Sequence, residues 1–88
     1  GSGAANQSGE ENVFLGSEAG SGNTTGSGNI FIGSFAGIQN QTGDQNITIG
    51  TDANVIGPNL SHATAIGAGA SVSTSNTIVL GRASEIDT

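Results

Sequence analysis

NVFLG, at residues 12–16, is the first of four related runs, and NIFIG, NITIG and ATAIG follow at residues 29–33, 46–50 and 63–67. Each run ends in a glycine, and successive glycines lie seventeen residues apart. The frame continues in NTIVLG at residues 76–81, but this final step is only fourteen residues. A fixed period of this length is typical of solenoids, in which each repeat forms one coil that packs on its neighbours. The sequence therefore predicts about five stacked coils.

Side chains alternate within each run, which is the period of a β-strand and not of a helix. Both alternating sets are largely apolar, which predicts strands that are covered on two sides. One set is assigned to the core of the roll: Val13, Leu15, Ile30, Ile32, Ile47, Ile49, Ile66, Ile78 and Leu80. The other set is assigned to an interface between identical chains: Phe14, Phe31, Thr48, Ala65 and Val79. We expect such an interface because one coil alone buries little apolar surface against the entropy of ordering it.

Each glycine is followed by a constant half with a recurring alanine, where we expect a second, weaker strand, and then by a variable segment. The variable segments span residues 21–28, 38–45 and 55–62. We expect the three additional residues of these longer coils to bulge outward as loops. Loops on a rigid scaffold commonly carry binding contacts. The candidate contacts are Phe35, Gln39, Asn40, Gln41 and Asp44. For Phe35, packing against a neighbouring subunit or loop is the alternative.

Asparagines recur in register along the predicted stack. Asn6, Asn23 and Asn40 share the seventeen-residue period with Gly9, Gly26 and Gly43. Both residue types tolerate positive φ, which predicts tight corners at these positions. Asn12, Asn29 and Asn46 stand just before the apolar runs. They predict a ladder of side-chain amides along the stack, with simple turn capping as the alternative.

Composition narrows the classes of function. The 88 residues carry a net charge of −6, with Arg82 as the only basic residue, which excludes binding to nucleic acid or to an anionic membrane surface. The absence of cysteine excludes disulfides and thiolate metal sites. No segment approaches the ~20 apolar residues of a membrane span, so no membrane insertion is expected. The chain is interpreted as one repeat domain over residues 1–88. Within it, residues 1–3 are typical of a cloning remnant, residues 12–67 form the longer coils, and residues 68–88 form a shorter coil and exit segment.

The sequence offers no candidate catalytic, cofactor or metal site. His62 is the only histidine, and no metalloprotease or calcium-loop motif surrounds it. Ser61, His62 and Asp52 do not form a credible triad, because adjacent Ser and His on one loop lack the required geometry. Asp44 and Glu10 occupy equivalent positions in different coils, which predicts a solvated acidic corner. We therefore expect no enzyme activity.

The last stretch resembles a known family. ATAIGAGASVSTSNTIVLG, residues 63–81, is similar to the head repeat of trimeric autotransporter adhesins of the YadA type. The matching positions are Ala65, Ile66, Gly67 and Ala70, followed by Val79, Leu80, Gly81 and Ser84. The upstream units, Asn12 to Gly20 and Asn29 to Gly37, resemble NTFIG-x-x-AG repeats of bacterial and phage tail-fibre-like proteins. The adhesin resemblance implies an all-β, left-handed parallel β-roll assembled as a homotrimer.

The resemblance also implies a function. It predicts a head or shaft segment of a bacterial surface adhesin, located outside the cell and bound to copies of itself. The external partner would be a host glycan or a matrix protein. The alternative is a segment of a phage or phage-like tail fibre that positions a receptor-binding tip on a virion.

Overall fold

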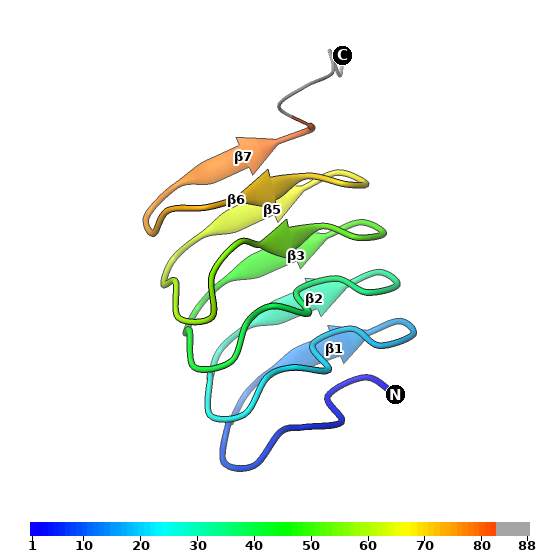
Figure 1. The fold of residues 1–88 in the computed structure, drawn as a ribbon, viewed down its shortest axis with the longest axis vertical. Helices are drawn as coiled ribbons and strands as arrows, with labels where there is room; N and C mark the ends of the chain where they lie inside the picture. Colours follow the sequence, from blue (N-terminus) through cyan, green and yellow to red (C-terminus); the bar gives the residue numbers. More distant parts are fainter. Residues whose placement is uncertain (83–88) are drawn as a thin grey trace.

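The computed structural model of the chain describes residues 1–82, so the end of the predicted exit segment and Ser84 lie outside the described residues. The described part is an all-β solenoid of about four turns, in which parallel strands are stacked one above another (Figure 1). Five stacked strands bound four complete turns, so the sequence-based count of five coils is one too many. No helix in residues 1–82 is long and apolar enough to cross a membrane.

The main sheet contains five short parallel strands, one from each apolar run. They are β1 (Val13–Leu15), β2 (Ile30–Ile32), β3 (Ile47–Ile49), β5 (Thr64–Ile66) and β7 (Ile78–Leu80), and they are hydrogen-bonded in this order. Equivalent repeat positions pair along the whole sheet, as Phe14 with Phe31 and Ala65 with Val79. The shorter step before β7 keeps this register, because the missing residues belong to the connector and not to the strand. The predicted strands and their spacing are confirmed.

The predicted second strand forms only in the later coils. There β4 (Asn54–Val55) pairs with β6 (Ser71–Val72) in a separate two-stranded parallel sheet. The equivalent residues after Ala19 and Ala36 are turns in the first two coils. The difference follows from what fills the interior of each coil.

The glycine that ends each strand is required by two constraints. Gly33 has a φ of 126°, a conformation that residues with a side chain rarely adopt. A Cβ on Gly33 would also lie 2.6 Å from the carbonyl carbon of Gly50 in the next coil. The period of the glycines therefore reflects both a sharp backbone bend and close contact between coils.

The two faces of the main sheet are exchanged relative to the sequence-based assignment. The set predicted as an interface lies inside the coil: Phe31, Thr48 and Ala65 are fully buried, and Phe14 and Val79 are half-buried at the two ends of the sheet. The set predicted as the core lies on the outer face: Val13, Leu15, Ile30, Ile32, Ile47, Ile49, Ile66, Ile78 and Leu80. Alternation defines two faces but, when both are apolar, does not tell which one points inward.

Aromatic rings fill the first two coils. Phe14 and Phe31 stack with their ring centroids 5.2 Å apart and their planes 9° from parallel. The rings lie against the opposite wall of the coil, where Gly20 and Gly37 leave room for them. A Cβ on Gly20 would lie 2.6 Å from a ring carbon of Phe14.

Aliphatic side chains from the opposite wall fill the later coils. Thr48 and Ala65 take the places of the two phenylalanines, and they leave space inside the coil. Val55 and Val72, which belong to β4 and β6, occupy that space and are fully buried or nearly so. A side chain that points inward from this wall suits an extended backbone, which explains why the second sheet begins here.

Asparagine side chains close one corner of the longer coils. Nδ2 of Asn23 donates to Oδ1 of Asn6 at 2.8 Å, and Nδ2 of Asn40 donates to Oδ1 of Asn23 at 2.8 Å. These residues form the amide-to-amide ladder, although the sequence assigned them to positive-φ corners. Gly26 has no positive φ and is needed for space, since a Cβ there would lie 2.6 Å from Oδ1 of Asn23.

A second asparagine column stands beside the first, as the sequence predicts. Oδ1 of Asn12 accepts from the backbone N–H of Asn29, and Oδ1 of Asn29 accepts from the N–H of Asn46, both at 2.9 Å. Asn29 and Asn46 are fully buried, as are Asn23 and Asn40. Because parts of segments 21–28 and 38–45 fold inward to make these bonds, the prediction that the added residues simply bulge outward is wrong.

Candidate functional site

The outer face of the main sheet carries a continuous apolar strip. We define the outer strip as the first and third residues of every strand: Val13, Leu15, Ile30, Ile32, Ile47, Ile49, Thr64, Ile66, Ile78 and Leu80. Nine of these ten side chains are apolar. Leu15 is 63% exposed, Ile78 70% and Leu80 72%. Contiguous exposed apolar surface of this kind marks interaction sites on soluble proteins.

Exposure varies along the outer strip in a regular way. The side chains of β2 and β3 are less exposed than those of β1 and β7, because equivalent residues of the coils above and below cover their flanks. What remains exposed in the middle is the outward tip of each side chain. The outer strip is therefore a closely packed row that another flat apolar surface can cover.

The exchange of faces changes which residues can contact another chain. Phe31, Thr48 and Ala65 are enclosed by their own coil and cannot form the interface that the sequence assigned to them. The outer strip takes their place as the candidate surface. The prediction that both faces of each strand are apolar is confirmed. The prediction of which face points into the coil is wrong.

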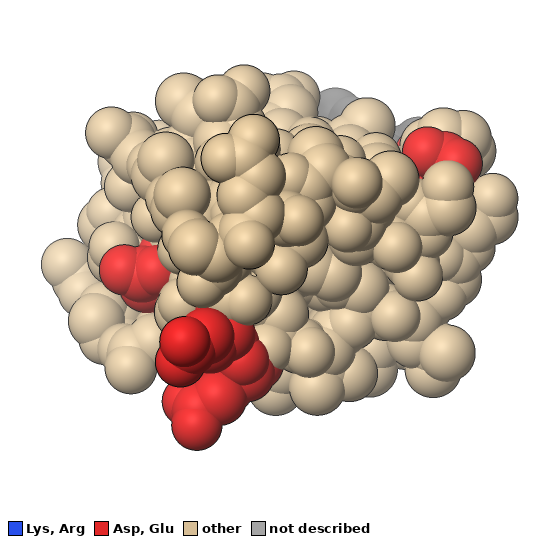
Figure 2. Space-filling view, turned by 90° about the horizontal axis from the view of Figure 1, so that it is seen from below, with Lys and Arg blue, Asp and Glu red and all other residues tan. Residues whose placement is uncertain are grey.

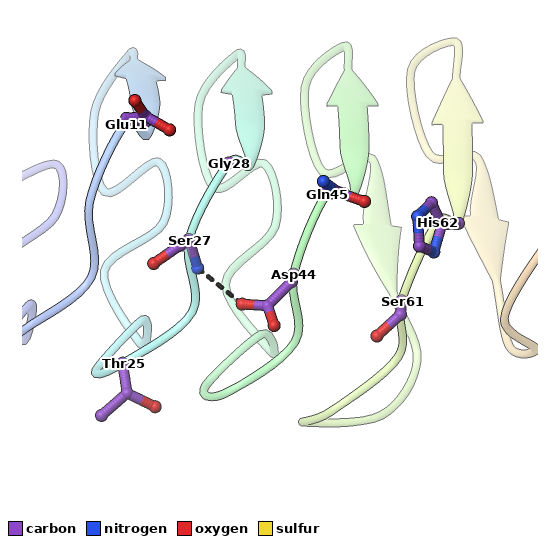
Figure 3. Close-up of a pocket in the computed structure, with 8 residues that line it drawn as sticks. All are labelled: Glu11, Thr25, Ser27, Gly28, Asp44, Gln45, Ser61 and His62. Carbon is purple, nitrogen blue, oxygen red and sulfur yellow. Dashed lines mark hydrogen bonds between the residues drawn. The ribbon is translucent and has the colours of Figure 1, made fainter.

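A polar groove runs along the corner that precedes the main sheet. It has a volume of about 520 Å³ and crosses successive coils just before the strands begin (Figure 3). We name it the corner groove and define it by its lining residues: Glu11, Thr25, Ser27, Gly28, Asp44, Gln45, Ser61 and His62. Its size falls in the usual range of ligand-binding pockets.

Two columns of residues build the corner groove. In one column, Oδ1 of Asp44 accepts from the backbone N–H of Ser27 at 2.8 Å (Figure 3). Oγ of Ser27 in turn accepts from the N–H of Glu10 at 3.0 Å. In the other column, the backbone is left-handed, with φ values of 58° at Glu11 and 59° at Gln45. The first column is tied along the stack by hydrogen bonds, and the second turns its side chains out toward the groove.

Acidic side chains dominate the charge of the molecule. Viewed from the N-terminal end of the stack, they gather mainly at one corner, and no basic side chain is visible (Figure 2). Arg82, at the other end, is the only basic residue of the chain. The corner groove therefore has no Lys or Arg side chain to bind an anionic ligand.

The predicted ligand contacts do not come together. Gln39, Gln41 and Asp44 are exposed, but Asn40 is fully buried and belongs to the asparagine ladder, so its prediction as a contact is wrong. Only Asp44 lines the corner groove. Phe35 is 44% exposed and adopts a φ of 62° at a different corner of the coil.

Sequence reasoning missed most of the corner groove. Glu11, Gln45 and His62 stand at the same point of their repeats, one residue before the second asparagine column or its equivalent. That shared spacing is the signal that could have found them. Their proximity to the serines depends on the bend of the backbone, which the sequence pattern does not describe.

The candidate metal-binding and triad residues are not brought together within residues 1–82. No group of three or more His, Cys, Asp or Glu side chains is placed to hold a metal ion in this part of the chain. No hydrogen bond among the described residues joins Ser61 and Asp52 to His62. His62 lies exposed beside the corner groove.

Comparisons with known proteins do not guide the functional assignment. No protein-family model, no curated protein and no solved structure matches it. The functional argument therefore depends on the geometry of the outer strip and the corner groove.

Proposed function

We propose that the chain is a non-enzymatic, homotrimeric head or shaft segment of a bacterial surface adhesin. The observation that supports this proposal best is the outer strip. A soluble solenoid with nine apolar side chains in register on one face gains stability when that face is covered, at about 25 cal/mol for each Å² of apolar surface removed from water. A second and a third copy of the chain offer the same flat, apolar surface.

The proposed assembly places three outer strips around one axis. Closed rotational symmetry is the usual form of homo-oligomers, because it satisfies every copy of the interface. A strip that runs parallel to the stack makes such an axis coincide with the long direction of the solenoid. The trimer and the left-handed roll are taken from the resemblance to YadA-type head repeats.

The proposed role outside the cell is mechanical. A stack tied by ladder hydrogen bonds and buried amides holds its exposed corners at fixed positions. Three chains on one axis present each corner three times, and multivalency of this kind raises avidity even when each contact is weak. The partners expected for such a segment are host glycans or matrix proteins.

A tail-fibre segment of a phage or phage-like particle is the second candidate. The observation that favours it is confined to the first two coils, Asn12 to Gly20 and Asn29 to Gly37, which resemble tail-fibre-type repeats and carry the stacked phenylalanines. In that case the same rigid assembly positions a receptor-binding tip. Both candidates require the trimer.

The mass of the protein in solution tests the proposal. Light scattering of the 88-residue chain should give three times the chain mass of 8.5 kDa. Leu15→Glu combined with Ile66→Glu places two charges in the outer strip and should yield a monomer or an unfolded chain. Gln41→Glu combined with Thr51→Glu adds the same charge at exposed positions outside the strip and should leave the trimer intact. A wild-type protein that is folded at 8.5 kDa, or at twice that mass, would refute the proposed assembly.

A further inference from the structure

The corner groove is lined by Gly28, a position where close packing does not require a glycine. Gly28 occupies the position that Glu11 and Gln45 hold in the coils on either side. A Cβ on Gly28 would meet nothing nearer than Cγ of Gln45 at 3.4 Å, which is ordinary contact. The neighbouring residues adopt the same left-handed conformation with full side chains. Gly28 is therefore not needed to let two backbone segments pack closely, and its missing side chain leaves open space between two coils.

Hydrogen-bonding groups around this space are available to a ligand. The side chains of Glu11, Gln45 and His62 make no hydrogen bond with any residue in the range 1–82. The oxygens of Glu11 can accept, the amide of Gln45 can donate and accept, and the ring nitrogens of His62 add further hydrogen-bonding groups. Thr25 and Ser61 add hydroxyl groups that can do either. Such a lining fits a ligand with many hydroxyl groups.

Other ligand classes fit less well. The lining contains no Lys or Arg to bind phosphate, sulfate or an acidic sugar. It also contains no apolar side chain, and the imidazole of His62 is its one aromatic ring, which is too little to cover a flat hydrophobic ligand. Among uncharged ligands, a polyhydroxylated one fits this lining best.

The repeat of the groove matches that of an extended sugar chain. Equivalent residues of neighbouring coils are about 4.8 Å apart along the stack, because this is the spacing of paired strands. One pyranose ring extends a β-1,4-linked chain by a similar length. We propose that the corner groove binds an extended, neutral glycan whose rings follow the stack, with one ring in the space over Gly28. This inference rests on the proposed attachment role and names its ligand class.

Titration with neutral β-1,4-linked tetrasaccharides of glucose, N-acetylglucosamine and mannose tests the inference. Calorimetry measures affinity, and amide chemical shifts locate the site. We expect saturable binding of at least one of them, with shifts at Gly28, Gln45 and His62. Maltotetraose, whose α-1,4 linkages curve the chain, and free glucose should bind at least about tenfold more weakly.

A variant with a side chain in the space over Gly28 tests whether the ligand binds there. Gly28→Gln installs the side chain that Gln45 carries at the same backbone conformation, and it should weaken binding at least about tenfold. Asp52→Gln places the same side chain at a left-handed position outside the groove, and it should leave binding unchanged. Circular dichroism checks that both variants fold. The inference is overturned if no tetrasaccharide binds saturably up to about 10 mM, or if both variants bind as the wild type does.

Light scattering of the same samples separates this inference from the proposed function. A trimer that binds none of the tetrasaccharides overturns the glycan inference and leaves the assembly standing. A folded monomer that binds them supports the corner groove as a glycan site and refutes the trimer.

Discussion

The hydroxyl group of Thr48 is the one buried side-chain polar atom in residues 1–82 that lacks a hydrogen-bond partner. Thr48 is fully buried between Phe31 and Ala65, its register neighbours in the sheet. Its Oγ1 gives up hydrogen bonds to water on folding and gains none in return. Valine has nearly the same shape and no such group.

The expected gain from Thr48→Val follows from this environment. A buried polar group without a partner costs about 1–3 kcal/mol, and an apolar group of the same shape removes that cost. No cavity forms and no bond is lost, so the variant should be more stable by about 1–3 kcal/mol. For a chain of this size, the unfolding midpoint should rise by at least about 4 °C.

Thermal and urea unfolding followed by circular dichroism measure this effect. Thr42→Val is the control, because Thr42 is exposed and a substitution there should change the free energy of unfolding by less than about 0.5 kcal/mol. Equal stability of the two variants, or a loss of stability in Thr48→Val, would show that the hydroxyl group has a partner and that the interior is not packed as described.

Two further substitution pairs test the stacking of the coils by the same unfolding assays. Asn40→Ala should lower the free energy of unfolding by about 2–4 kcal/mol, because it removes a fully buried link of the ladder. Asn6→Ala, at the exposed end of the ladder, should lower it by about 1 kcal/mol. Equal losses in the two variants would contradict the ladder. Gly33→Ala should cost more than about 2 kcal/mol, since its Cβ would overlap the backbone of Gly50. Gly57→Ala should cost only about 1–2 kcal/mol of backbone strain, because its Cβ would meet nothing closer than a side-chain atom of Leu60 at 3.5 Å, and a reversed order would refute the proposed close approach.

The sequence was sufficient for the strands, their parallel order and their register. These depend on the recurrence of apolar runs and glycines, and a repeat protein must align equivalent positions to stack at all. The fourteen-residue spacing between the last two glycines also keeps the register, because Thr64 pairs with Ile78 at the equivalent repeat position.

The inward direction of each strand was not accessible from alternation. Both faces are apolar, so the usual contrast of polar and apolar positions is absent. A cue was present six residues downstream, where Gly20 and Gly37 follow Phe14 and Phe31 at the same interval. Small residues opposite large ones are what a narrow interior requires, since core side chains must fill the space without overlap. The corner groove depends on backbone bends for which the repeat gives no comparable cue.

The asparagine ladder has a consequence for how such proteins change length in evolution. The amides of Asn23 and Asn40 each bond to the equivalent asparagine of the preceding coil, so an in-frame duplication of one repeat unit within the ladder region supplies its own partners. The coils with aromatic interiors lie in this region and can be multiplied in this way, as long as the duplicated unit includes both the strand residue and the opposite wall. Natural variation of length would then proceed in steps of about 4.8 Å, one coil at a time, without any new type of contact.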